Sequence, residues 1–185
     1  KTWSPWQSVL QKGEWLWRLT WHADQAYGIS YRYTDVANRK SPWVITLFQT
    51  RDAVNFIKVA ELDVSGYPCE ATVRFTSAGE MIALVRREDP RKFGAWLGRS
   101  VAPYTQWTWN PLGVHLDCPD FVETSDGVIL AAGRIMEDSE SGEQLERTAL
   151  CRIIGGQVKA VLTLPSAGDT SYPGIVLQDK ILWIS

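Results

Sequence analysis

Residues 67–87, which read YPCEATVRFTSAGEMIALVRR, decide the fold. Two stretches rich in apolar and β-branched residues, 70–76 and 80–87, flank the short turn sequence Ser77-Ala78-Gly79. Alternation of this kind predicts strands, and the short turn containing glycine predicts an antiparallel hairpin. Long patterns with a helical period are absent from the chain, so we expect an all-β fold.

The same strand-and-turn pattern recurs on both sides of this hairpin. The polar stretch 137–146 is predicted to be a solvated loop, and residues 3–10 are predicted to form an outer strand of a preceding unit. The other strands are expected at 15–22, 26–33, 43–49, 56–62, 94–100, 106–109, 120–124, 128–135, 147–154, 157–164 and 174–177.

A proline precedes each new round of the pattern, at Pro68, Pro119 and Pro173, with spacings of 51 and 54 residues. Four strands in roughly 50 residues is the period of a β-propeller blade. A β-sandwich also spaces its strands regularly but requires no such self-similarity, and it is the alternative. We therefore predict a single partial β-propeller domain over residues 1–185, with about three and a half four-stranded blades of an expected six. The blade repeats are 15–66, 67–117, 118–170 and an incomplete 171–185.

Composition excludes several classes of protein. The 185 residues carry a formal net charge of −2, with 45% hydrophobic and 22% charged residues, which is ordinary for a globular chain. A net charge so close to zero does not indicate a basic surface for nucleic acid, and no apolar run is long enough to span a membrane. The chain starts at Lys1 and ends directly after the apolar run 181–184, so we interpret it as a piece of a longer protein. An open arc of blades would expose an apolar face and favour self-association.

The three cysteines, Cys69, Cys118 and Cys151, lie far apart in the sequence. There is no CxxC pair and no cluster of cysteine with histidine, so we predict no metal site and no cofactor. The simplest expectation is three partly buried thiols. A bridge between Cys69 and Cys118, and the redox compartment, stay open.

One arginine stands seven residues after each of the first three hairpin turns, and we predict that the three share one structural position. Converging arginines could bind a carboxylate in a bidentate manner, whereas the alternative is a set of solvated strand ends. A shift of one residue in register would turn Arg87 inward instead. The three arginines are Arg32, Arg86 and Arg134.

Three segments in this order, 67–87, 118–134 (CPDFVETSDGVILAAGR) and 171–185 (SYPGIVLQDKILWIS), resemble the sialidase (neuraminidase) superfamily. The resemblance is closest to the bacterial sialidase-like six-bladed propellers with BNR repeats. The segment 100–107 (SVAPYTQW) is similar to a degenerate form of the family's Asp-box turn, S-x-D-x-G-x-x-W.

The resemblance implies a secreted or periplasmic parent that acts as a retaining glycoside hydrolase on terminal sialic-acid-type glycans. It assigns Tyr172 as the nucleophile, Glu70 as its base, and Arg86 (or Arg87) with Arg134 as a clamp for the sugar carboxylate. The family's first clamp arginine and its acid/base aspartate have no convincing counterpart and are expected upstream of Lys1. Candidates for the acid within the chain are Asp117 and Asp120. Arg18 lies among tryptophans, where it either stacks or reaches the propeller axis.

A tyrosine nucleophile suits a substrate that carries its own carboxylate, because a neutral phenol avoids charge repulsion. It needs a base, since the reference pKa of tyrosine is about 10. Trp107 and Trp109 alternate onto one face and could edge a sugar site. Two other functions stay open: a non-catalytic propeller that binds acidic glycans or a protein partner, and a purely structural unit with solvent-facing arginines.

Overall fold

The computed structural model describes residues 2–3, 5–38, 40–89, 94–138, 142, 144–166 and 172–185. In these residues the chain forms only strands, turns and loops, and no helix is long and apolar enough to span a membrane. The strands form four antiparallel sheets: three with four strands each and one with two. The expected all-β class is therefore confirmed.

Each sheet is a simple meander, in which every strand pairs with the next one along the chain. Sheet 1 contains β1 (Trp15–His22), β2 (Gln25–Tyr33), β3 (Trp43–Thr50) and β4 (Ile57–Leu62). Sheet 2 contains β5 (Pro68–Phe75), β6 (Met81–Arg87), β7 (Trp96–Ser100) and β8 (Thr108–Pro111). Sheet 3 contains β9 (Asp117–Glu123), β10 (Ile129–Asp138), β11 (Gln144–Ile154) and β12 (Gln157–Thr163), and sheet 4 contains β13 (Ile175–Gln178) and β14 (Ile181–Ile184).

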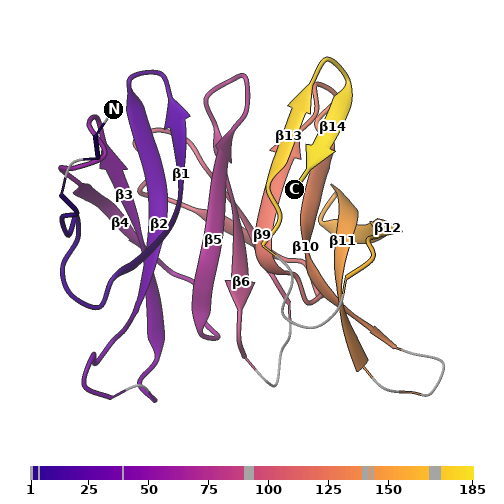
Figure 1. Cartoon of the computed structure of the whole chain (residues 1–185), viewed down its shortest axis with the longest axis horizontal. Coiled ribbons are helices and arrows are strands. Elements are labelled where there is room, and N and C mark those ends of the chain that lie inside the picture. Colours follow the sequence, from indigo (N-terminus) through magenta and orange to yellow (C-terminus); the bar gives the residue numbers. More distant parts are fainter. Residues whose placement is uncertain are drawn as a thin grey trace.

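The sheets follow one another in chain order across the molecule (Figure 1). The first strands of successive sheets are neighbours: β1 contacts β5, β5 contacts β9, and β9 contacts β13. Because these four strands run side by side, whatever stands at the start of each one gathers at one end of the molecule. We call this end the entry face, and the end with the turn after each first strand the turn face.

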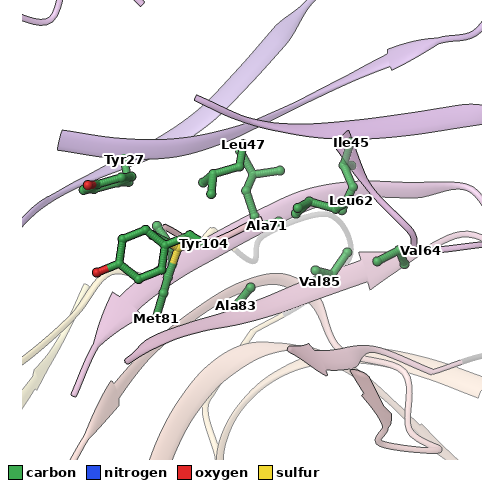
Figure 2. Close-up of a cluster of buried hydrophobic side chains, with 12 residues drawn as sticks. Tyr27, Ile45, Leu47, Leu62, Val64, Ala71, Met81, Ala83, Val85 and Tyr104 are labelled. Atoms are coloured by element: carbon green, nitrogen blue, oxygen red, sulfur yellow. The ribbon is translucent and has the colours of Figure 1, made fainter. Parts of the chain in front are cut away.

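The core fills the spaces between neighbouring sheets. Strand β6 is buried on both sides, and its successive side chains point to opposite faces, as the strand period requires. Met81, Ala83 and Val85 pack against sheet 1, around Ile45 and Leu47 (Figure 2). The alternate residues of β6 pack against sheet 3, around a cluster that includes Ile82, Leu84, Phe121, Ile129 and Ala131. One strand thus contributes to two cores, and this explains its continuous apolar run.

The predicted strands match the observed ones closely, with differences at the starts of β5 and β9. These strands begin at Pro68 and Asp117, two and three residues earlier than predicted. Prolines suggested a break, but Pro68 and Pro119 lie at or beside irregularities of the ladder, where no backbone donor is needed. The prolines therefore lie within the strands that they were expected to precede.

Two expectations from the sequence differ from the structure. Residues 137–146 were expected to be a solvated loop, but Glu137 pairs with Leu145 and Asp138 with Gln144, so β10 and β11 extend into both ends of this stretch. Residues 139–141 and 143 lie outside the described residues. Backbone pairing alone sustains such an extension, whatever the polarity of the side chains. Residues 3–10 hold no strand in the part that the structure describes, and Trp3 and Trp6 are almost fully exposed there.

All three cysteines are free and buried, so the bridge left open between Cys69 and Cys118 is not formed. Burial raises the pKa of the Cys151 thiol to about 11 and that of Cys118 to about 12. Both thiols are therefore protonated near neutral pH, and neither is an activated nucleophile.

Gly98 of β7 provides a test of how sheet 2 packs. A Cβ atom at this position would lie 2.2 Å from the ring of Trp109, its pairing partner on β8. We expect Gly98→Ala to lower the free energy of unfolding by about 1–3 kcal/mol because the ring must move. Urea denaturation measures this loss.

The double variant Gly98→Ala/Trp109→Ala should lose less than the sum of the two single variants, because removing the ring removes the clash. Strictly additive losses would contradict the proposed contact.

Candidate active site

A shared irregularity shapes the start of the first strand in sheets 1, 2 and 3. In each case the pairing with the second strand is interrupted and two residues of the first strand leave the ladder. Such bulges re-aim side chains and are common beside active sites. The residues that leave the ladder are Trp17-Arg18, Cys69-Glu70 and Cys118-Pro119.

Arg86 joins two of these starts through carboxylates. Its Nη1 donates to Glu70 Oε2 at 2.6 Å, its Nε lies 3.0 Å from Asp117 Oδ1, and its Nη2 pairs with Glu88. Burial disfavours the charge on Arg86, but the hydrogen bond to Glu70 and the charge of Asp117 raise its pKa above the ordinary value. Two buried carboxylates, Glu70 and Asp117, are thus held by one guanidinium group.

Asp117 is shared by three partners. His115 Nε2 lies 2.7 Å and Arg134 Nη2 lies 3.2 Å from its Oδ2 atom, while Arg86 approaches Oδ1. Burial alone would raise the pKa of the Asp117 carboxyl, but the His115 hydrogen bond and the two arginines outweigh burial and hold that pKa low. Asp117 is therefore charged at neutral pH.

Asp120, the other candidate acid, has a structural environment. Its Oδ1 pairs with Arg74 and accepts from the Phe121 N–H at 2.9 Å, and its Oδ2 lies 3.3 Å from Arg18 Nη1 and accepts from the Ile175 N–H at 3.0 Å. Both oxygens of Asp120 are thus engaged by two arginines and two backbone amides within the protein. These contacts give Asp120 a structural role.

Aromatic side chains gather beside the carboxylates on the entry face. Tyr31 stacks between Trp15 and Trp43, with ring centroids 6.0 and 5.8 Å away. Tyr172 is about half exposed (51%), and its ring centroid lies 5.6 Å from that of Trp17. We call these five residues the aromatic shelf.

Tyr31 links the shelf to the carboxylates. Burial raises its pKa above the ordinary value, and Cys69, Glu70 and Tyr172 add to the increase while Arg86 opposes it. The phenol therefore stays protonated near neutral pH. Because Tyr31 interacts with both Glu70 and Tyr172, these three residues share one electrostatic neighbourhood.

The arginines that were candidates from the sequence have different partners in the structure. Arg86 and Arg134 both pair with Asp117. Arg18 pairs with Asp120 of β9, and the Nη2 of Arg18 also donates to the Pro173 carbonyl at 2.7 Å. Arg87 turns away: its Nε donates to the Ser65 carbonyl at 2.6 Å and its guanidinium lies 4.5 Å from the Trp96 ring centroid. Arg32 pairs with Glu14 at 3.2 Å.

The prediction that Arg32, Arg86 and Arg134 share one structural position is wrong. Arg134 pairs with Asp117 just before the irregularity of sheet 3, and the matching residue of sheet 2 is Arg87, which pairs with Pro68. Arg32 lies beyond the last pair of β1 with β2. Arg86 and Arg134 still converge, because both reach the same carboxylate.

The sequence did not predict that Tyr31 lies at the site, nor that His115 forms a hydrogen bond with Asp117. The spacing of His115 and Asp117 was a usable signal, since residues two apart in an extended segment share a side. Tyr31 carried no signal, because it alternates like any core residue of β2. Among the described residues, no group of three or more His, Cys, Asp and Glu side chains is arranged to hold a metal ion.

No protein-family model matches the sequence, and no curated protein matches it. Several solved structures share its fold. A protein of unknown function from Dyadobacter fermentans DSM 18053 superposes with a TM-score of 0.66 at 16% identity, covering 90% of this chain and 47% of its own. A protein described as a "putative exo-beta-1,3-galactanase" from Bifidobacterium bifidum s17 gives 0.58 at 13% identity, covering 91% and 60%. The chain thus spans about half the length of these structures, and at such identities the likeness concerns the fold.

Asp117→Ala tests the buried cluster. Removing this carboxylate leaves Arg86 and Arg134 buried with one partner fewer, so we expect the free energy of unfolding to fall by about 3–5 kcal/mol. The control is Asp24→Ala, which removes an exposed pair with Arg51 at 3.4 Å and should cost about 0–1 kcal/mol. Equal losses in the two variants would contradict the assignment.

The same carboxylate predicts a pH dependence of stability. Its pKa is lowered in the folded state, so its contribution is present above the unfolded value of about 3.9 and is lost as pH falls through the folded value. The difference in unfolding free energy between the wild type and Asp117→Asn should therefore shrink below about pH 4. Urea titrations at pH 7, 4 and 3 measure it, and a constant difference would contradict the lowered pKa.

Proposed function

We propose that the four sheets are consecutive blades of a β-propeller and that its entry face is the site of a glycoside hydrolase. The observation that carries this proposal is the position of two buried carboxylates, Glu70 and Asp117, on one guanidinium beside the aromatic shelf. The likeness to a structure described as a galactanase is compatible with it.

The aromatic shelf supplies what a sugar needs for binding. Small-molecule sites are lined mainly by apolar and aromatic groups, with a few polar groups that fix orientation. The half-exposed ring of Tyr172 and the exposed ring of Trp15 offer apolar faces to the C–H side of a pyranose.

The carboxylates supply what hydrolysis needs. Most glycoside hydrolases use two carboxyl groups, one charged group that acts as nucleophile or base and a second that exchanges a proton with the leaving group. Asp117 suits the first role, because its low pKa keeps it charged. Glu70, on the other side of the Arg86 guanidinium, is the second carboxyl group.

The substrate that fits these charges best is a neutral sugar. Arg86 is compensated by Glu70, Glu88 and Asp117, and Arg134 by Asp117 and by Glu146 at 3.5 Å. A sialic acid carboxylate would have to displace one of these internal partners to reach a guanidinium. The carboxylate clamp that the sialidase resemblance implies therefore receives no support from Arg86 and Arg134.

A second candidate is the sialidase-type reaction itself, with Tyr172 as nucleophile and Glu70 as base. Its support is that Glu70 and Tyr172 both contribute to raising the pKa of Tyr31. For this reaction the acid would have to be a residue other than Asp117 and Asp120. The lowered pKa of Asp117 keeps it charged, and both oxygens of Asp120 accept hydrogen bonds within the protein.

Hydrolysis of 4-methylumbelliferyl glycosides distinguishes these candidates. We expect turnover of a neutral glycoside, such as the β-galactoside, and a loss of about 100-fold or more in kcat for Glu70→Gln, because a general acid–base group contributes at least that much. Tyr172→Phe should change kcat less than threefold. The control Glu61→Gln alters a half-exposed carboxylate away from the cluster and should have no effect.

Turnover of the sialoside alone, abolished by Tyr172→Phe, would establish the second candidate and overturn the first. Absence of turnover for every neutral and acidic glycoside, with folding verified by circular dichroism, would contradict the hydrolase proposal.

A further inference from the structure

A hollow lies at the turn face, away from Glu70 and Asp117. It is a groove of about 900 Å³ between β7 and β8 of sheet 2 and two turns of sheet 3, after β9 and after β11. Its volume falls within the range of small-molecule sites. The turns after β1, β5 and β13 point to the same end of the molecule in Figure 1, opposite the starts of these strands.

One wall of the groove is a fixed aromatic ring. Trp107 lines it and stacks on Trp109, with centroids 5.2 Å apart and an interplanar angle of 13°. Trp109 in turn lies against Gly98, and Trp107 Nε1 donates to the Tyr104 carbonyl at 2.9 Å. The Trp107 ring is thus held in place from one face and from its edge. Because the ring is already ordered, binding of a ligand costs little side-chain entropy.

The polar groups of the groove are balanced in charge. Arg99 pairs with Glu80 and lies 3.7 Å from Glu123, so its charge is compensated within the protein. Gln106 and Asn110, both exposed, add neutral amides to the lining. Amides and paired charges bind hydroxyl groups well but give no preference for a charged ligand.

The opposite wall is low, because it is made of glycine turns. A Cβ atom at Gly127 or Gly155 would meet nothing within 4 Å, so open space lies over these two glycines, whereas Gly156 lies against the Asn110 side chain. Leu97, Ile129 and Ile153 form an apolar floor. The groove therefore combines an aromatic wall, neutral hydrogen-bonding groups and open space above a low rim.

We propose that this groove binds a neutral oligosaccharide. The ring of Trp107 would stack on one sugar, and Gln106, Asn110 and Arg99 would bind its hydroxyl groups. The open rim admits a chain rather than a single closed-in residue. This binding site is separate from the entry face and would hold a glycan whether or not the entry face is catalytic.

Isothermal titration calorimetry with three probes, maltohexaose, cellohexaose and β-1,3-galactohexaose, tests the proposal. We expect at least one probe to bind with a Kd below about 1 mM. Trp107→Ala should weaken that binding at least tenfold. Thr108→Arg, which adds a long side chain to an exposed position of the groove, should weaken it similarly and decides the matter if Trp107→Ala does not fold.

Two variants serve as controls. Trp21→Ala removes an exposed tryptophan of sheet 1, and Glu70→Gln alters the entry face; neither should change the Kd. Absence of binding by all three probes would overturn the proposal. Binding that Glu70→Gln weakens and the groove variants leave intact would also overturn it, since the glycan would then occupy the entry face.

Discussion

The arrangement of the sheets depends on the carboxylate of Asp120. It lies on β9, is almost completely buried, and binds Arg18 from β1, Arg74 from β5 and the backbone of β13 through Ile175. One anion thus connects the first strands of all four sheets. Breaking a buried pair by removing one partner is costly, because the remaining charges stay buried without compensation. Two arginines would be left in that state without Asp120.

Neutral hydrogen bonds support the same junction. Thr20 Oγ1 donates to the Val73 carbonyl at 2.6 Å, and Thr72 Oγ1 donates to the Pro119 carbonyl at 2.6 Å. These bonds run from each first strand to the next and satisfy carbonyls that the sheet ladders do not reach. First strands have no ladder partner in the neighbouring sheet, so their side chains must provide the connection. Thr20 and Thr72 are therefore structural.

The sequence was sufficient to predict the strands, because alternation and turn residues are local signals. Thirteen of the expected positions lie within a few residues of observed strands, and the differences at Pro68 and Asp117 come from bulges. The prediction for the arginines failed for a different reason. Five residue pairs lie between the bulge and the turn in sheet 2 but four in sheet 3, so the ladder aligns Arg134 with Arg87 and not with Arg86.

The sequence could not predict which charged side chains pair with one another. The alternation of β2 gives Tyr31 the pattern of a core residue, and nothing in its neighbours indicates that it faces Glu70. Likewise, an arginine at a strand end carries no sign of whether its partner is a ligand or a carboxylate of the same chain. Only the spatial arrangement shows that Glu70, Glu88, Asp117 and Glu146 compensate Arg86 and Arg134.

The repeated bulge explains how equivalent backbones can carry different chemistry. At the same place in sheets 1, 2 and 3 the residue that leaves the ladder is Arg18, Glu70 or Pro119. The first binds the junction at Asp120, the second holds Arg86 at the entry face, and the third offers a carbonyl to Thr72. Because a bulged residue is released from pairing, its side chain can change without loss of the sheet. The scaffold therefore keeps its repeat while each repeat contributes a different group to the interior and the entry face.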